Sequence, residues 1–173
     1  QDGQGNCSKA MLLLFPLMEA VRSGGEAVTL DQSREGSGLR IVSEAGCRLP
    51  LYCTSQGKLF LAYCSSEGEQ ARLLRAHPPV PHTPHTITDP GQLAQELHKI
   101  RTQGYAVEDG EFRIGLRSVS APVFGLGGAL QYALGVVGLF RHTTAPEFTL
   151  AIRLSTEYAA QITDELSGLS EHS

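Results

Sequence analysis

The stretch Cys47–Lys58, with the sequence CRLPLYCTSQGK, decides the fold. Its first half, Leu49–Cys53, is apolar and extended, as expected of a short strand that enters the core. Thr54–Lys58 is typical of a tight turn, and Leu59–Ala62 continues it as the start of a helix. We therefore predict a strand that runs through one turn directly into a helix.

Outward from this stretch, the next segment carries a helix signal and then a helix breaker. Ser66 followed by Glu69 is a capping-box pattern, which places a helix across 67–76. Proline excludes regular structure for several residues beyond it, because it lacks the backbone N–H and fixes φ. These prolines are Pro78, Pro79, Pro81 and Pro84.

The clearest predicted helix follows. Asp89 suits the N-cap, Pro90 the first helical position, and Gly104 the residue just past the end. One face of this helix is apolar and consists of Leu93, Leu97 and Ile100. The three signals together fix both ends of the helix.

The last third of the chain predicts strands and one long helix. The strands are Tyr105–Val107, Ser118–Phe124 and Ala129–Gly138. Gly125–Gly128 suits a hairpin turn between the last two. The helix begins near Pro146 and is closed by Gly168. Its apolar stripe is Phe148, Ile152, Ser155, Tyr158, Ala159, Ile162 and Leu166.

The first third predicts a helix and two strands. Apolar residues at three- and four-residue spacing favour a helix from Ser8 to Ser23, kinked at Pro16 and ended by Gly24-Gly25. Short strands are expected at Glu26–Leu30 and Leu39–Ser43, around the polar loop 33–38. Helices at both ends and a hairpin-rich middle predict an α+β fold, an antiparallel sheet with helices packed on it.

Length and composition indicate one cytoplasmic domain that should bind nucleic acid poorly. The 173 residues suffice for a single domain, 8–173, preceded by a glycine-rich segment, 1–7, that is either a linker or a cloning remnant. The 14 basic and 18 acidic residues give a net charge of −4 and form no basic block for phosphates. The apolar run 10–15 is too short to span a membrane and lacks the features of a signal peptide.

The turn at Thr54–Lys58 is a candidate anion site. The first turn of a helix offers unpaired N–H groups and the positive end of the helix dipole, which bind carboxylate or phosphate. The alternative is that Ser55 only caps its own helix. A phosphate-binding loop is excluded, since Tyr52 occupies a glycine position of that motif and Lys58 is followed by leucine.

A second candidate is the charged segment Glu108-Asp109-Gly110-Glu111, followed by Arg113, Arg117 and Ser118. Paired carboxylates could serve a hydrolase, but a charged segment between strands is more often a solvated turn. His77, His82 and His85 are close in sequence, yet no cysteine or carboxylate completes a ligand set, so we expect no metal and no cofactor.

The cysteines Cys7, Cys47, Cys53 and Cys64 form no CxxC pair, and we expect reduced thiols. Cys53 lies beside the proposed anion site, where the helix dipole could make a reactive thiolate. A cysteine in a strand is more often a small buried apolar residue. A thiol redox enzyme, with Cys53 as nucleophile and Cys47 or Cys64 resolving, is therefore the alternative to a ligand-binding domain.

Four blocks resemble the effector-binding domains of IclR-type transcriptional regulators. The first, Cys47–Lys58, is similar to the family pattern Gly-Arg-x-x-Pro-Leu-His-x-Thr-x-x-Gly-Lys. The others, in the expected order and spacing, are Thr86–Pro90, Ile100–Ala106 and Gly115–Phe124. The resemblance covers roughly 45–139, and the terminal helix also fits.

The resemblance implies a GAF-like antiparallel sheet flanked by helices and a non-enzymatic sensor of a small organic acid. It implies that amides before the motif glycine hold the ligand's carboxylate, and that Glu108, where the family usually has Asp, and Ser118 hold its other end. The ligand-binding residues expected on this basis are Ser55, Gln56, Gly57, Glu108, Leu116, Ser118, Gly135 and Val137. It also implies a homodimer or tetramer and a winged helix-turn-helix, absent from this chain, that binds DNA under the control of the ligand.

Three differences from the family matter. Gly135 and Val137 stand where some members have polar residues, so we expect that wall of the pocket to be roomier and more apolar. A carboxylate at Glu108 would repel an acid unless it is protonated or accepts from a hydroxyl, which favours a hydroxylated or aromatic acid. Between Leu30 and Leu39 the chain is about a dozen residues shorter than the family's opening hairpin.

The sequence leaves an interaction module, with a packed core in place of a pocket, as a further alternative. We predict that the ligand acts by changing how the first helix, Ser8–Ser23, packs next to the DNA-binding domain.

Overall fold

A computed structural model describes residues 17–24, 26–32 and 46–168. Its strands are β1 (Leu17–Ser23), β2 (Glu26–Gln32), β3 (Arg48–Pro50), β4 (Ala106–Asp109), β5 (Arg117–Phe124) and β6 (Leu130–Gly138). Its helices are α2 (Ser55–Ala62), α3 (Glu67–Ala76), α4 (Pro90–Gln103), the 3-10 turn η1 (Leu126–Gly128) and α5 (Pro146–Gly168). The α+β prediction is confirmed.

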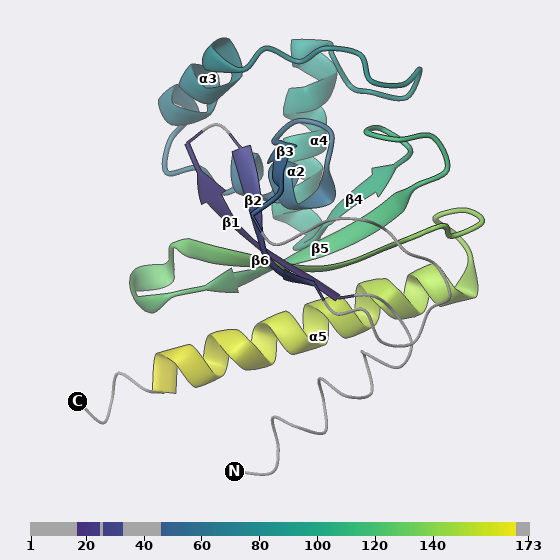
Figure 1. Cartoon of the computed structure of the whole chain (residues 1–173). Helices are drawn as coiled ribbons and strands as arrows, with labels where there is room; N and C mark the ends of the chain where they lie inside the picture. The colour runs from purple at the N-terminus through teal and green to yellow at the C-terminus, as the bar shows by residue number, and fades with distance from the viewer. Residues whose placement is uncertain (1–16, 25, 33–45, 169–173) are drawn as a thin grey trace.

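The strands form one antiparallel sheet with the order β3-β2-β1-β6-β5-β4. Figure 1 shows α5 crossing one face of this sheet, while α2 and α4 lie on the other. Alternate residues of β5 therefore serve different layers. Val119, Ala121 and Val123 pack towards α5, and Ser118 and Ser120 lie on the α2 face.

The helices α3, α4 and α5 form where their capping signals predict. The Ser66 side chain accepts from the Glu69 amide, and Asp89 accepts from the Gln92 amide. Gly104 ends α4 in the left-handed conformation, with φ 84°. Only the return contact of the capping box differs, because the Glu69 carboxylate accepts from the amide and hydroxyl of Ser65.

The helix predicted over Ser8–Ser23 is wrong in its second half, because residues 17–23 form strand β1. The helical spacing was counted across Pro16, which interrupts a helix. Ser23 pairs with Glu26, so the chain turns back from β1 into β2 at this point and no helix ends here. β1 is then held between β2 and β6, and these pairings override the helical pattern.

The remaining N-terminal predictions differ in outcome. The strand predicted at Glu26–Leu30 is confirmed as β2. The first half of the predicted helix, the loop 33–38, the strand Leu39–Ser43 and most of the shortened region lie outside the described residues. Within the described part of the chain, no helix is long and apolar enough to cross a membrane.

Candidate ligand-binding site

The first turn of α2 is built around Thr54, which is its N-cap, so the alternative in which Ser55 caps this helix is wrong. The Thr54 hydroxyl donates to the Pro50 carbonyl at 2.8 Å and accepts from the Gly57 amide at 3.1 Å. One side chain thus joins the end of β3 to the start of α2. Ser55 is left free of the capping role and points into the domain, with no exposed surface.

Gly57 allows this turn to close. A Cβ atom at Gly57 would lie 2.4 Å from the Leu51 Cα and 2.5 Å from the Pro50 oxygen. Backbone atoms this near cannot move aside cheaply, so only glycine fits. The motif glycine therefore has a steric role, and it sets how closely the strand and the helix approach.

Four buried polar side chains meet beneath the amino end of α2. The Ser118 hydroxyl lies 2.8 Å from a Glu108 carboxylate oxygen and 2.8 Å from the Ser55 hydroxyl. The Ser55 hydroxyl lies 2.8 Å from that of Ser120. We call these four residues the Glu108 chain; each is at most 2% exposed. Ser120 was missed from the sequence, although its two-residue spacing from Ser118 on one strand predicts the same face.

The proton content of the Glu108 chain depends on Glu108. Burial raises the pKa of its carboxyl to about 7, although hydrogen bonds from Ser118 and the Phe112 amide act in the opposite direction. Each serine hydroxyl has one proton to donate. When Glu108 is ionised, Ser118 donates to it; when Glu108 is protonated, Ser118 can donate to Ser55 instead. The chain can therefore present either polarity to a ligand.

The sheet register aligns most of the predicted site residues. Glu108, Ser118 and Val137 form one cross-strand row over β4, β5 and β6, and Gly135 pairs with Ser120 in the next row. The extra room expected at Gly135 is not found there, because a Cβ would lie 2.4 Å from the Val119 oxygen and 2.5 Å from the Ser120 hydroxyl.

Two further predicted residues lie at the edges of this arrangement. Leu116 is half-buried in the turn before β5, and its carbonyl accepts from the Gly110 amide at 2.9 Å. Gln56 is buried next to Ser55, whose hydroxyl lies 3.4 Å from the Gln56 side-chain oxygen. Ser55, Gln56 and Gly57 thus form the first turn of α2, above the two cross-strand rows.

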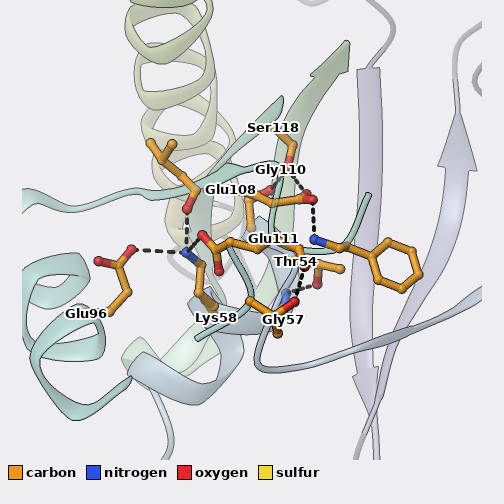
Figure 2. Close-up of polar contacts among 12 residues, drawn as sticks. Thr54, Gly57, Lys58, Glu96, Glu108, Gly110, Glu111 and Ser118 are labelled. Atoms are coloured by element: carbon orange, nitrogen blue, oxygen red, sulfur yellow. Dashed lines mark hydrogen bonds and ion pairs between the residues drawn. The ribbon is translucent and has the colours of Figure 1, made fainter. Parts of the chain in front are cut away.

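Lys58 ties α2 to the rest of the domain and is fully buried. Figure 2 shows its ammonium group between the carboxylates of Glu96 and Glu111, at 3.1 and 2.6 Å. It also donates to the Val107 carbonyl at 2.6 Å. All three ammonium protons are therefore used within the protein. This role was not foreseen, because the partners come from α4, β4 and the following turn.

The charged segment Glu108–Glu111, which begins in β4, is not the solvated turn that its charges favour. Glu111 is 6% exposed, and one of its oxygens is buried without a hydrogen-bond partner. Burial raises the pKa of Glu111, partly offset by Lys58. Asp109, in contrast, is exposed and pairs with Arg117 at 2.7 Å. The glutamates therefore point inwards, while Asp109 faces solvent.

Cys53 and His82 do not have the surroundings that their candidate roles require. Cys53 has no exposed surface, and burial raises the pKa of its thiol to about 12, with Glu108 and Glu111 adding to the effect. The prediction of a reactive thiolate is therefore wrong, because desolvation outweighs the helix dipole. His82 stacks on Tyr52 instead of joining a metal cluster, and none is found among the described residues.

The antiparallel sheet with helices on its two faces defines a GAF-like α+β domain (Figure 1). The family described as "Bacterial transcriptional regulator IclR C-terminal" matches residues 18–163. The chain therefore belongs to the IclR family of bacterial transcriptional regulators and corresponds to their C-terminal, effector-binding domain. The resemblance seen in the sequence is confirmed.

Individual relatives agree. The chain is 29% identical over 153 residues to the HTH-type transcriptional repressor AllR of Escherichia coli K12. The aligned residues cover 88% of this chain and 56% of AllR. It thus spans little more than half the length of that relative. It is similar to IclR of Thermotoga maritima, with 28% identity and a TM-score of 0.83 over 96% of this chain and 69% of that one.

A further likeness concerns the fold alone. The inducer-binding domain of PobR from Acinetobacter, a double mutant in complex with 3-hydroxybenzoic acid, is 22% identical to this chain. The TM-score is 0.76, over 91% of this chain and 90% of that one.

Proposed function

We propose that this domain senses a small organic acid between the amino end of α2 and the Glu108 chain, and that the acid controls DNA binding by the whole regulator. The observation that carries the proposal is the Glu108 chain itself, a buried run of hydrogen-bonding groups under a helix start. Buried polar groups cost stability unless they are hydrogen-bonded. Hydroxyl groups can either donate or accept, so this row of serines can hydrogen-bond to one another without a ligand and to a ligand when it is bound.

The proposed ligand contacts are those expected from the family. At the start of α2, the amides of Ser55 and Gln56 would hold the carboxylate with the help of the helix dipole, next to Gly57, whose own amide already donates to Thr54. Glu108 and Ser118 would meet a second polar group, with Leu116, Gly135 and Val137 around it. A Glu108 pKa of about 7 supports this, because a protonated carboxyl does not repel an acid. This favours a hydroxylated or aromatic acid, and the PobR domain of the same fold is in complex with one.

Thermal unfolding with a panel of hydroxylated and aromatic acids tests the proposal, with 3-hydroxybenzoate as the first probe. An acid that binds, present at a concentration of 100 times its Kd, should stabilise the domain by about 2.7 kcal/mol. The stabilisation should be larger at pH 6 than at pH 8, because binding is linked to protonation of Glu108.

Matched variants localise the effect. Ser118→Ala should remove most of the stabilisation, whereas Thr102→Ala, on the exposed face of α4, should leave it intact. If no acid in the panel stabilises the domain, or if Ser118→Ala responds like the parent, the proposed site is wrong.

We infer that the route to DNA runs through β1 in place of the helix first expected there. β1 pairs with β6, where Met18 lies opposite Gly135, so the first described strand pairs directly with a residue of the proposed site. A cytoplasmic homodimer or tetramer, with a winged helix-turn-helix in the whole protein, fits this route. Native mass spectrometry would weigh the assembly and any retained acid, and a monomer would contradict it.

A further inference from the structure

A cavity of about 240 Å³ lies apart from the Glu108 chain. It is bordered by α3, by the proline-containing segment 77–82 that follows it, by the start of β2 and by the end of β3, and it opens to solvent beside the exposed residues His77, Pro78 and Val80. Its apolar wall includes Leu61, Leu73, Leu74 and Val80. None of the four residues of the Glu108 chain lines it. Two successive residues face the two regions. Tyr52 lines the cavity, whereas the pKa of the Cys53 thiol is raised by the charges of Glu108 and Glu111.

The wall also has polar residues, of which Tyr52 and His82 contact each other. The Tyr52 hydroxyl lies 2.9 Å from His82 Nε2, and the two rings stack with centroids 6.0 Å apart. Tyr52 is 5% exposed, and burial raises the pKa of its hydroxyl. Phe112 packs edge-on against the other side of His82, with centroids 5.1 Å apart. The Tyr52–His82 pair is thus held in place and gives the cavity a hydrogen-bonding edge beside its apolar residues, while Glu26 and His77 line it as well.

Size and chemistry restrict what the cavity can hold. An apolar cavity of about 150 Å³ binds benzene, so this one has room for a single ring with a small substituent. No lysine or arginine is among the described residues that line it, and the lining includes the carboxylate of Glu26, so the site disfavours an anion. We propose that the cavity is a second small-molecule site, which takes a neutral, single-ring molecule with one hydroxyl group, of which phenol is the simplest.

The segment that covers this cavity is fastened to the turn after β4. The Thr83 hydroxyl donates to the Gly110 carbonyl at 2.6 Å, and the Thr86 hydroxyl donates to the Glu111 carbonyl at 2.6 Å. His82 immediately precedes Thr83, so a ligand against His82 touches the same segment that holds this turn. The second site therefore shares its covering segment with the turn that carries Glu111.

Titration of the isotopically labelled protein with phenol, followed by amide NMR shifts, tests the proposal. A molecule of this size should bind with a Kd on the order of 1 mM. Saturable shifts are expected at 50–52 and 73–82. Val80→Trp places an indole at the half-exposed rim and should abolish them, whereas Leu126→Trp, at the exposed end of the β5–β6 hairpin, should retain them.

Ser118→Ala separates this site from the proposed acid site and should leave phenol binding unchanged. Shifts that do not saturate, that persist in Val80→Trp, or that disappear in Ser118→Ala would each overturn the second site.

Discussion

Replacing Lys58 with methionine should destabilise the domain more than any surface change of the same kind. Methionine has a similar length and keeps most of the apolar packing, so the substitution removes mainly the ammonium group. The Glu111 oxygen that now lies 2.6 Å from Lys58 would lose its partner, and its second oxygen already has none. The Val107 carbonyl would lose a donor as well.

The expected cost is about 3–5 kcal/mol, the range for breaking a buried ion pair by removing one partner. Typical domains are stable by only about 5–15 kcal/mol, so the loss is a large share of the total. With a urea dependence of about 2 kcal/mol per molar, the unfolding midpoint should fall by roughly 2 M. Glu111→Gln in the Lys58→Met background should recover part of the loss, because it removes the unpaired charge.

Urea unfolding followed by circular dichroism measures the effect. Lys99→Met is the matched control, because Lys99 is exposed on α4, and it should change stability by less than about 0.5 kcal/mol. A loss below about 1 kcal/mol for Lys58→Met, or no recovery from Glu111→Gln, would refute the reasoning that Lys58 neutralises a buried carboxylate.

Three further predictions follow from burial and close approach. The folded domain holds the Glu108 proton more tightly than the unfolded chain, so this contribution to stability is complete below about pH 4.5 and lost as pH rises through about 7. Glu108→Gln should therefore be more stable than the parent at pH 8 by about 2–3 kcal/mol, and the gain should shrink towards pH 4.5; a constant difference across this range in unfolding titrations would contradict it. Gly57→Ala should destabilise the domain by at least about 2 kcal/mol, since its Cβ meets the Leu51 backbone, whereas Gly68→Ala in α3 should be neutral or stabilising in the same urea assay. Cys53→Ser should leave the number of thiols that react in the native state unchanged, and the loss of one fast-reacting thiol would restore the redox hypothesis.

The candidate site was predicted unevenly from the sequence. The helix start at Ser55 was found because a strand followed by a turn and a helix is a local pattern. Glu108 and Ser118 were identified by family resemblance, and the register shows them opposite each other. Ser120 was missed although its two-residue spacing from Ser118 places it on the same face, because its contact with Ser55 depends on how α2 packs on β5.

The sequence by itself determined the helices and strands whose signals lie within a few residues of one another. The two ends of α4 are set by Asp89, Pro90 and Gly104, because caps and proline act on the adjacent backbone. Only the tertiary structure decided that residues 17–23 are a strand, since their partners in β2 and β6 are distant in the chain. It alone decided that Glu108 and Glu111 are buried, because burial depends on which elements pack above a residue. The charge of a side chain follows from the sequence, but the cost of that charge is set by its surroundings.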